Sequence, residues 1–280
     1  MQRVRPPGHG RSWLGPTALA GDDTGGSRRG QAKSAVPAGV GLVLACGGDG
    51  TVTACAEGVI GTGVPLAIIP MGTGNLLARN IGLPMDLDEA LAVALGGVQH
   101  PIDAGRVNGT LFVVMAGLGL DARMLSGTSD PLKKRLGWFA YAISAVRHLG
   151  DRPMKVTVSA DGGRRRRMPA NTLIVGNVGR LQGGLPLLPD VRPDDGMLDA
   201  VMLIASGLTG WLAAAANIVL RRPSRGGIYR IQFTELQVML DQEQLWERDG
   251  EVMGSARRLT VVAQPGALLL RMPPAAALTP

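Results

Sequence analysis

Two glycine-rich loops, each directly after a strand-like apolar run, limit the possible folds of this chain more than any other sequence feature. The run VGLVLAC at 40–46 precedes Gly47–Thr51 (GGDGT), and VPLAII at 64–69 precedes Gly72–Asn75 (GTGN). A helical pattern follows each loop, so strands and helices alternate. This alternation predicts a parallel sheet with helices on its faces. Both loops then leave the carboxyl ends of their strands, where they can border one ligand-binding crevice.

The composition of the two loops favours a phosphate ligand. Glycines let the backbone approach an anion, and the first N–H groups of the following helix point at it. Asp49 suits such a loop if it holds Mg²⁺, since the ion then bridges carboxylate and phosphate; the alternative is a tight turn in which Asp49 caps a helix. No Gly-Lys-Ser or Gly-Lys-Thr is present, which excludes a Walker-type loop. The candidate phosphate-binding residues are Gly47, Gly48, Asp49, Gly50, Thr51, Gly72, Thr73, Gly74 and Asn75.

The pattern changes beyond Leu95, where short strand-like segments separated by turns dominate. These segments predict a second domain of mainly antiparallel strands, interrupted by helices around 133–149 and 208–221. Residues 1–27 show no strand-like apolar run. The predicted division is a disordered leader at 1–27, an N-terminally incomplete α/β ATP-binding domain at 28–100 to which a C-terminal segment can return, a β-rich lipid-binding domain at 101–273 and a tail at 274–280.

The net charge of +7 indicates an anionic partner. Nucleic acid is not favoured, because the histidines lack zinc-ligand spacing and aromatic residues are not interleaved with basic ones. Cys46 and Cys55 stand in apolar surroundings and are typical of reduced thiols, which indicates a cytoplasmic protein. Glycines divide the uncharged stretch 200–220 into pieces too short to span a bilayer. The sequence leaves a homodimer open.

Seven motifs occur in a characteristic order: GGDGT at 47–51, IIPMGTGNLLARNIGLP at 68–84, IDAG at 102–105, GLGLDA at 117–122, NTLIVGNVGRLQGG at 171–184, LLPDVRPDDGMLD at 187–199 and DGE at 249–251. Together they resemble the catalytic domain of the diacylglycerol kinase family, in particular the bacterial lipid kinases related to sphingosine kinases. The resemblance implies an α/β nucleotide-binding domain like that of NAD kinases, followed by a β-rich domain, with the active site between them. It also implies ATP and Mg²⁺ as cofactors.

The resemblance further implies roles for single residues. Asp49 contributes to Mg²⁺ binding, and Asp103 is tied to this ion through water. Asp121 corresponds to a position near the lipid headgroup. Glu251 matches the general base that accepts the proton of the lipid hydroxyl, with Asp249 as its neighbour in the same network. Without the resemblance, Asp103 would be a strand-end turn residue, Asp121 a helix cap and the DGE motif a hairpin turn.

The turn PDDGM at 193–197 is the candidate for a second, structural ion, either Mg²⁺ or Ca²⁺. The resemblance suggests Asp195 as the side-chain ligand and the carbonyl oxygens of Arg192 and Met197 as further ligands. Oxygen ligands at this spacing around a glycine suit a hard cation. An ordinary turn is the alternative.

Two features depart from the family. Its members open with a β-strand and an Asn-Pro loop, and residues 1–30 contain neither an apolar run nor Asn-Pro. We therefore expect the first strand–helix unit to be missing, which would expose the flank of a parallel strand and remove part of the nucleotide site. In addition, Leu76-Leu77 stand where many relatives have Asp-Phe.

The function that these features predict is that of an ATP- and Mg²⁺-dependent kinase acting on a lipid hydroxyl, with diacylglycerol or a sphingoid or related lipid as substrate. The alternatives are a kinase of the NAD-kinase type with a soluble substrate, and a catalytically impaired remnant that binds lipid or nucleotide. A lipid kinase meets its substrate at a bilayer, where each basic residue contributes about 1 kcal/mol of attraction to an anionic surface. Lys133–Arg135 and Arg164–Arg167 are candidates for peripheral contact with the inner membrane face, or else solvated faces.

Overall fold

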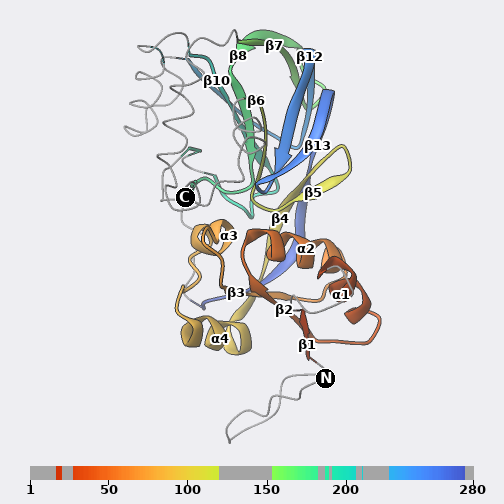
Figure 1. Cartoon of the computed structure of the whole chain (residues 1–280), viewed down its shortest axis with the longest axis vertical. Helices are drawn as coiled ribbons and strands as arrows, with labels where there is room; N and C mark the ends of the chain where they lie inside the picture. Colours follow the sequence, from red (N-terminus) through yellow and green to blue (C-terminus); the bar gives the residue numbers. More distant parts are fainter. Residues whose placement is uncertain are drawn as a thin grey trace, which may run out of the picture.

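A computed structural model of the chain combines a parallel α/β part with a larger antiparallel part. The structure describes residues 17–20, 28–119, 153–181, 187–188, 191–205, 210 and 227–274. In chain order its elements are β1 (Thr17–Ala20), α1 (Arg28–Ala35), β2 (Leu42–Gly47), α2 (Asp49–Val59), β3 (Leu66–Pro70), α3 (Leu76–Asn80), α4 (Leu87–Gly96), β4 (Val98–Val107), β5 (Thr110–Phe112), β6 (Met115–Gly119), β7 (Met154–Ala160), β8 (Arg166–Ala170), β9 (Thr172–Gly176), β10 (Leu198–Leu203), β11 (Ile228–Phe233), β12 (Glu235–Arg248) and β13 (Glu251–Met272). Figure 1 shows the two parts one above the other.

The parallel part consists of β1, β2 and β3, paired in that order. Helices α1 and α2 lie on one side of these strands and α4 on the other (Figure 1). This arrangement explains the nearly unbroken apolar run of β2, because its alternate residues enter different cores. Val43 and Ala45 belong to the core that includes α1 and α2, whereas Leu42 and Leu44 join Ala90 of α4.

The prediction that residues 1–27 contain no strand is wrong at Thr17–Ala20. This segment forms β1 and runs parallel to β2, with Thr17 opposite Leu42 and Ala20 opposite Ala45. Its sequence, TALA, is only four residues long, too short for hydrophobic periodicity to reveal it. Backbone pairing with β2 makes it a strand. The flank of β2 that we expected to be exposed is therefore paired.

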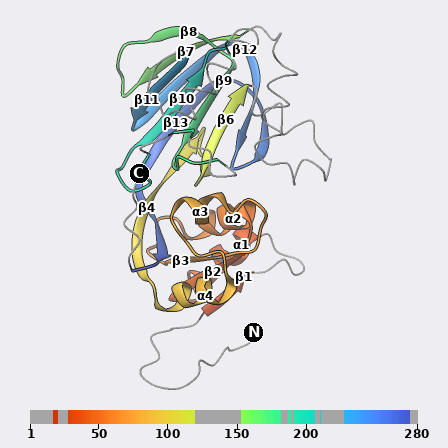
Figure 2. The same cartoon turned by 90° about the vertical axis from the view of Figure 1, so that its left-hand side faces the viewer.

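The antiparallel part is arranged around β12, which pairs with β6, β7 and β13. Its core includes Phe112, Phe233, Leu236 and Trp246. Strand β13 also pairs with β4 and reaches β3 at Leu270, so β4 and β13 connect the two parts of the molecule (Figure 2). The predicted fold class, an α/β part followed by a mainly antiparallel β-rich part, is confirmed.

The helices predicted around 133–149 and 208–221 lie outside the described residues, apart from Gly210. Lys133–Arg135 also lie outside them. Within the described segments, no helix has the length and apolar character needed to cross a bilayer.

Gly58 sets how closely α2 approaches α1, and Gly58→Ala is expected to destabilise the protein. A Cβ atom at this position would lie 2.6 Å from the Cβ of Ala32 and 2.8 Å from the backbone N of Lys33. Forcing the helices apart should lower the free energy of unfolding by about 1–3 kcal/mol. This loss exceeds the ~0.5–1 kcal/mol that alanine normally gains over glycine inside a helix.

Gly96→Ala in α4 is the matched control, because a Cβ there would have no other atom within 4 Å. Its unfolding free energy is expected to be unchanged or higher by up to about 1 kcal/mol. Urea unfolding of both variants checks the comparison. A Gly58→Ala protein as stable as Gly96→Ala would show that the α1–α2 contact is not tight.

Candidate active site

The two glycine loops touch each other at the carboxyl ends of β2 and β3. The backbone N of Met71 donates a 3.0 Å hydrogen bond to Gly47 O. A Cβ atom at Gly48 would lie 3.2 Å from the Cα of Gly72, so the backbones approach too closely for a larger residue to fit without displacement. The structure therefore brings the predicted phosphate-binding segments together at one edge of the sheet.

Asp49 connects the first loop to the helix that follows the second. It is the first residue of α2, but its side chain caps the start of α3. Its Oδ1 accepts hydrogen bonds from Leu76 N at 2.6 Å and Leu77 N at 3.4 Å. A Cβ atom at Gly74 would lie 2.7 Å from Oδ2, so this oxygen lies against the second loop. Burial raises the pKa of Asp49, which means that its negative charge is costly until a cation or donor compensates it.

Asn75 closes the second loop on itself. Its Oδ1 accepts from Gly72 N at 2.9 Å, and its Nδ2 donates to Gly72 O at 2.8 Å. The residue is buried and has a positive φ of 48°, a conformation that asparagine tolerates better than most residues. Asn75 therefore shapes the loop with its side chain. In the same region Thr51 is buried, whereas Gly50 and Thr73 are exposed.

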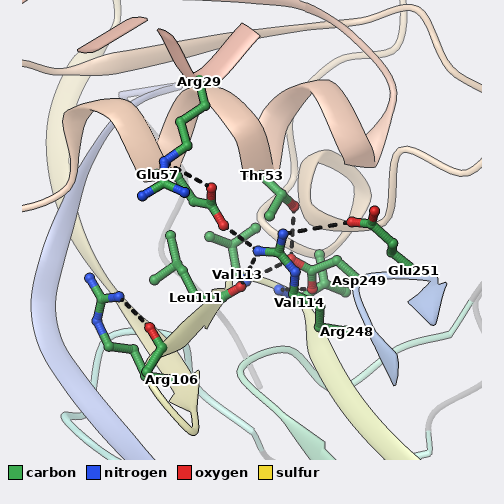
Figure 3. Close-up of polar contacts among 11 residues, drawn as sticks. Arg29, Thr53, Glu57, Arg106, Leu111, Val113, Val114, Arg248, Asp249 and Glu251 are labelled. Atoms are coloured by element: carbon green, nitrogen blue, oxygen red, sulfur yellow. Dashed lines mark hydrogen bonds and ion pairs between the residues drawn. The ribbon is translucent and has the colours of Figure 1, made fainter. Parts of the chain in front are cut away.

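Asp249 holds the DGE turn in place. Its Oδ1 accepts from the backbone N of Val114 and Met115 at 2.9 and 3.0 Å, and its Oδ2 accepts from Val113 N at 2.9 Å and Thr53 Oγ1 at 2.7 Å (Figure 3). Burial raises the pKa of Asp249, and these donors oppose the shift. A carboxylate enclosed by four protein donors is a structural anchor and is poorly placed to take a substrate proton.

Glu251 is the accessible carboxylate of the same motif. Its side chain is 71% exposed, and its Oε2 lies 3.6 Å from Nη2 of Arg248. A carboxylate in this environment is free to accept a proton from a substrate hydroxyl. Of the two acidic residues in the motif, Glu251 therefore suits the role of base and Asp249 the role of its support.

The described hydrogen bonds of the Asp103 side chain connect it to the turn of the second candidate ion site and not to the glycine loops. Its Oδ2 accepts from Gly196 N and its Oδ1 from Gly266 N, both at 2.7 Å. It is only 2% exposed, and burial raises its pKa, with Asp195 and Asp194 adding to the shift. Asp103 thus fixes the turn that carries Asp195.

Asp195 already has protein partners. Its Oδ1 accepts from Met197 N at 3.0 Å and its Oδ2 from Gln232 Nε2 at 2.9 Å. Across the described residues, no three His, Cys, Asp or Glu side chains converge as a metal-binding group. Asp121, the predicted lipid-headgroup residue, lies outside the described residues.

Sequence reasoning missed three residues that surround the DGE turn: Thr53 and Glu57 of α2, and Arg248. Thr53 donates to Asp249, and Arg248 donates to Glu57 (Figure 3). The available signal was the spacing of Thr53 and Glu57, which places two polar groups one turn apart on a largely buried helix. The identity of their partner could not be read locally, because it lies about 190 residues away in the sequence.

Comparison with known proteins covers most of the chain. Residues 20–107 match the diacylglycerol kinase catalytic domain, and residues 113–272 match the YegS C-terminal NAD kinase beta sandwich-like domain. The chain is 35% identical over 264 residues to "Probable lipid kinase YegS-like" of Pseudomonas aeruginosa, covering 89% of this chain and 85% of the relative. It is 32% identical over 203 residues to "Diacylglycerol kinase" of Bacillus subtilis, covering 71% of this chain and 65% of that relative. The fold also resembles a crystal structure named "a putative diacylglycerol kinase from Bacillus anthracis str. Sterne". The TM-score is 0.76 at 26% sequence identity, and the match covers 91% of this chain and 84% of that one.

Proposed function

We propose, since the chain belongs to the diacylglycerol kinase family of lipid kinases, that it transfers the γ-phosphoryl group of ATP to the hydroxyl group of diacylglycerol or a related lipid. The observation that carries the proposal is the position of α2. This helix begins at Asp49 in the first glycine loop, and Thr53 one turn later donates to Asp249 of the DGE turn. A phosphate loop and the segment with the base thus share one framework, as a reaction that depends on positioning requires.

Each part of the site has a role in this reaction. Gly47–Thr51 and Gly72–Asn75 bind the phosphates of ATP through backbone N–H groups, other than those of Thr51 and Gly72, which donate to Gly48 O and Asn75 Oδ1. The positive end of α2 adds to the attraction. Glu251 accepts the proton of the lipid hydroxyl as its oxygen attacks the γ-phosphorus. The bond between that phosphorus and the bridging oxygen breaks, and ADP leaves with the electron pair. Asp249 keeps Glu251 in position.

Mg²⁺ is the cofactor that suits Asp49. This ion commonly binds through one or two carboxylates, with phosphate oxygens and water completing its shell, so a single carboxylate beside the phosphate loops fits it. When bound, it neutralises the charge of the transferred phosphoryl group. For the turn at Asp195 we propose a structural Mg²⁺ or Ca²⁺ with the carbonyl oxygens of Arg192 and Met197, and we assign Asp103 to the support of that turn.

We also propose that the protein is cytoplasmic and contacts an anionic bilayer through Arg164–Arg167, at the β7–β8 hairpin. All four side chains are exposed, and none forms an ion pair with another residue that the structure describes. Arg166 lies over the ring of Tyr229, 5.7 Å from its centroid, and donates to the hydroxyl group. Guanidinium groups that form no ion pair with a described carboxylate are available to phosphate headgroups.

Product analysis tests this function. With ATP, Mg²⁺ and vesicles of diacylglycerol in anionic phospholipid, the chain is expected to form a lipid phosphate, detected by thin-layer chromatography with radiolabelled ATP. Replacing the anionic phospholipid with a neutral one should lower the rate, and NAD should remain unphosphorylated. Phosphorylation of NAD without any lipid product would overturn the proposal in favour of a soluble substrate. ATP binding without transfer to either acceptor would identify the chain as a binding remnant.

A further inference from the structure

Arg248 and Asp249, two consecutive residues, bind the same face of helix α2. Asp249 accepts a hydrogen bond from Thr53, and Arg248 donates one to Glu57 (Figure 3). Thr53 and Glu57 are four residues apart, which places them one turn apart on one side of the helix. The turn that carries Glu251 is thereby attached twice to the helix that begins in the first glycine loop.

The guanidinium group of Arg248 lies between two carboxylates. Its Nη1 donates to Glu57 Oε1 and, at 2.7 Å, to Leu111 O, while its Nη2 lies 3.6 Å from Glu251 Oε2. The side chains of Arg248 and Glu57 are 14% and 12% exposed, against 71% for Glu251. Arg29 of α1 completes the series, with its Nε 3.3 Å from Glu57 Oε2. Positive and negative groups therefore alternate from α1 to Glu251.

The two contacts of Arg248 differ in kind. Its hydrogen bonds to Glu57 and Leu111 are shielded from water, so they fix the guanidinium group firmly. The approach to Glu251 is longer and exposed, and such pairs contribute little to stability. A weak contact of this kind restricts the directions in which the Glu251 side chain points, yet leaves its carboxylate able to accept a proton.

We propose that Arg248 is a positioning residue: anchored to α2 through Glu57, it directs the carboxylate of Glu251 toward the acceptor hydroxyl. The inference rests on the proposed function, in which Glu251 is the general base. A misplacement of about 1 Å in a reacting group lowers a rate by about 10²-fold. Loss of the guanidinium group therefore acts on kcat, whereas the KM for ATP depends on the glycine loops.

Arg248→Met is expected to lower kcat by about 10–100-fold and to change the KM for ATP by less than about threefold. Glu57→Gln, at a residue whose described ion pairs are with Arg29 and Arg248, is expected to lower kcat by about tenfold. The double variant should be no slower than Arg248→Met alone, because both changes act through one pair. Arg106→Met is the control: Arg106 Nη1 donates to Gly109 O in the nearby β4–β5 turn, and kcat should not change.

The Glu251→Gln background separates positioning from a purely structural role. The Glu251→Gln protein retains a residual rate, which radiolabelled ATP can measure. Adding Arg248→Met is expected not to lower this rate further, because the carboxylate that Arg248 positions is absent. A further loss as large as in the unaltered chain would overturn the inference, as would a full kcat of Arg248→Met. If circular dichroism shows that Arg248→Met does not fold, Glu57→Gln in the same background gives the same comparison.

The outcomes also separate this inference from the proposed function. Activity of Arg248→Met together with inactivity of Glu251→Gln would overturn the role of Arg248 alone. Absence of lipid phosphorylation by the unaltered chain would overturn the proposed function, and with it the inference that rests on it.

Discussion

Glu251→Gln is expected to lower kcat for lipid phosphorylation by about 10²–10⁴-fold, the usual contribution of a general base. Glutamine keeps the shape of the side chain but cannot accept the proton. Since Glu251 is 71% exposed and lies 3.6 Å from Arg248, the free energy of unfolding should change by less than about 0.5 kcal/mol. Initial rates at saturating ATP and lipid, with urea unfolding of the same preparation, measure both quantities.

Glu243→Gln is the matched control, because Glu243 is an exposed glutamate on β12 outside the contacts of the site. It is expected to keep the full rate. A full rate in Glu251→Gln would show that another group takes the proton. Asp249 is an unsuitable substitute, because its oxygens already accept hydrogen bonds from Val113, Val114, Met115 and Thr53.

The parallel strands and both glycine loops could be predicted because their signals are local. An apolar run followed by glycines and a helical pattern is contained within about 30 residues, the length of one strand–helix–strand unit. Strand β1 gave no such signal: TALA becomes a strand through pairing with β2, which is a tertiary effect. Intrinsic patterns of four residues carry too little information to reveal it.

The roles of Asp103 and Asp249 could not be predicted for a related reason. Both carboxylates bind backbone N–H groups, which every residue except proline possesses, so their partners leave no trace in the sequence. Asp249 reaches Val113, 136 residues away, and Asp103 reaches Gly266, 163 residues away. The family resemblance of the DGE motif indicated that the two acidic residues act together, but only the contacts distinguish the enclosed Asp249 from the exposed Glu251.

Asp49→Asn and Asp49→Ala are expected to separate the two tasks of this carboxylate. Asparagine keeps an oxygen that can accept from Leu76 N and Leu77 N, and burial already raises the pKa of Asp49, so losing the charge should not destabilise the ion-free protein. Its free energy of unfolding should change by less than about 1 kcal/mol. Alanine leaves those N–H groups unsatisfied and should cost about 1–3 kcal/mol.

Both variants are expected to lose about 10²–10³-fold in kcat/KM at a fixed Mg²⁺ concentration, because each removes the charge that holds the cation. In Asp49→Asn the rate should recover in part at higher Mg²⁺, which a magnesium titration measures. Asp88→Asn, at an exposed carboxylate in the first turn of α4, is the control and should leave the titration curve unchanged. If Asp49→Asn kept the original Mg²⁺ dependence while Asp49→Ala lost activity and stability together, Asp49 would be a cap for α3 and not an ion ligand. Asparagine keeps an oxygen that can accept from the N–H groups of α3, so Asp49→Asn removes only the charge of Asp49. The effect of that lost charge on the Mg²⁺ dependence therefore decides whether Asp49 is an ion ligand or a cap.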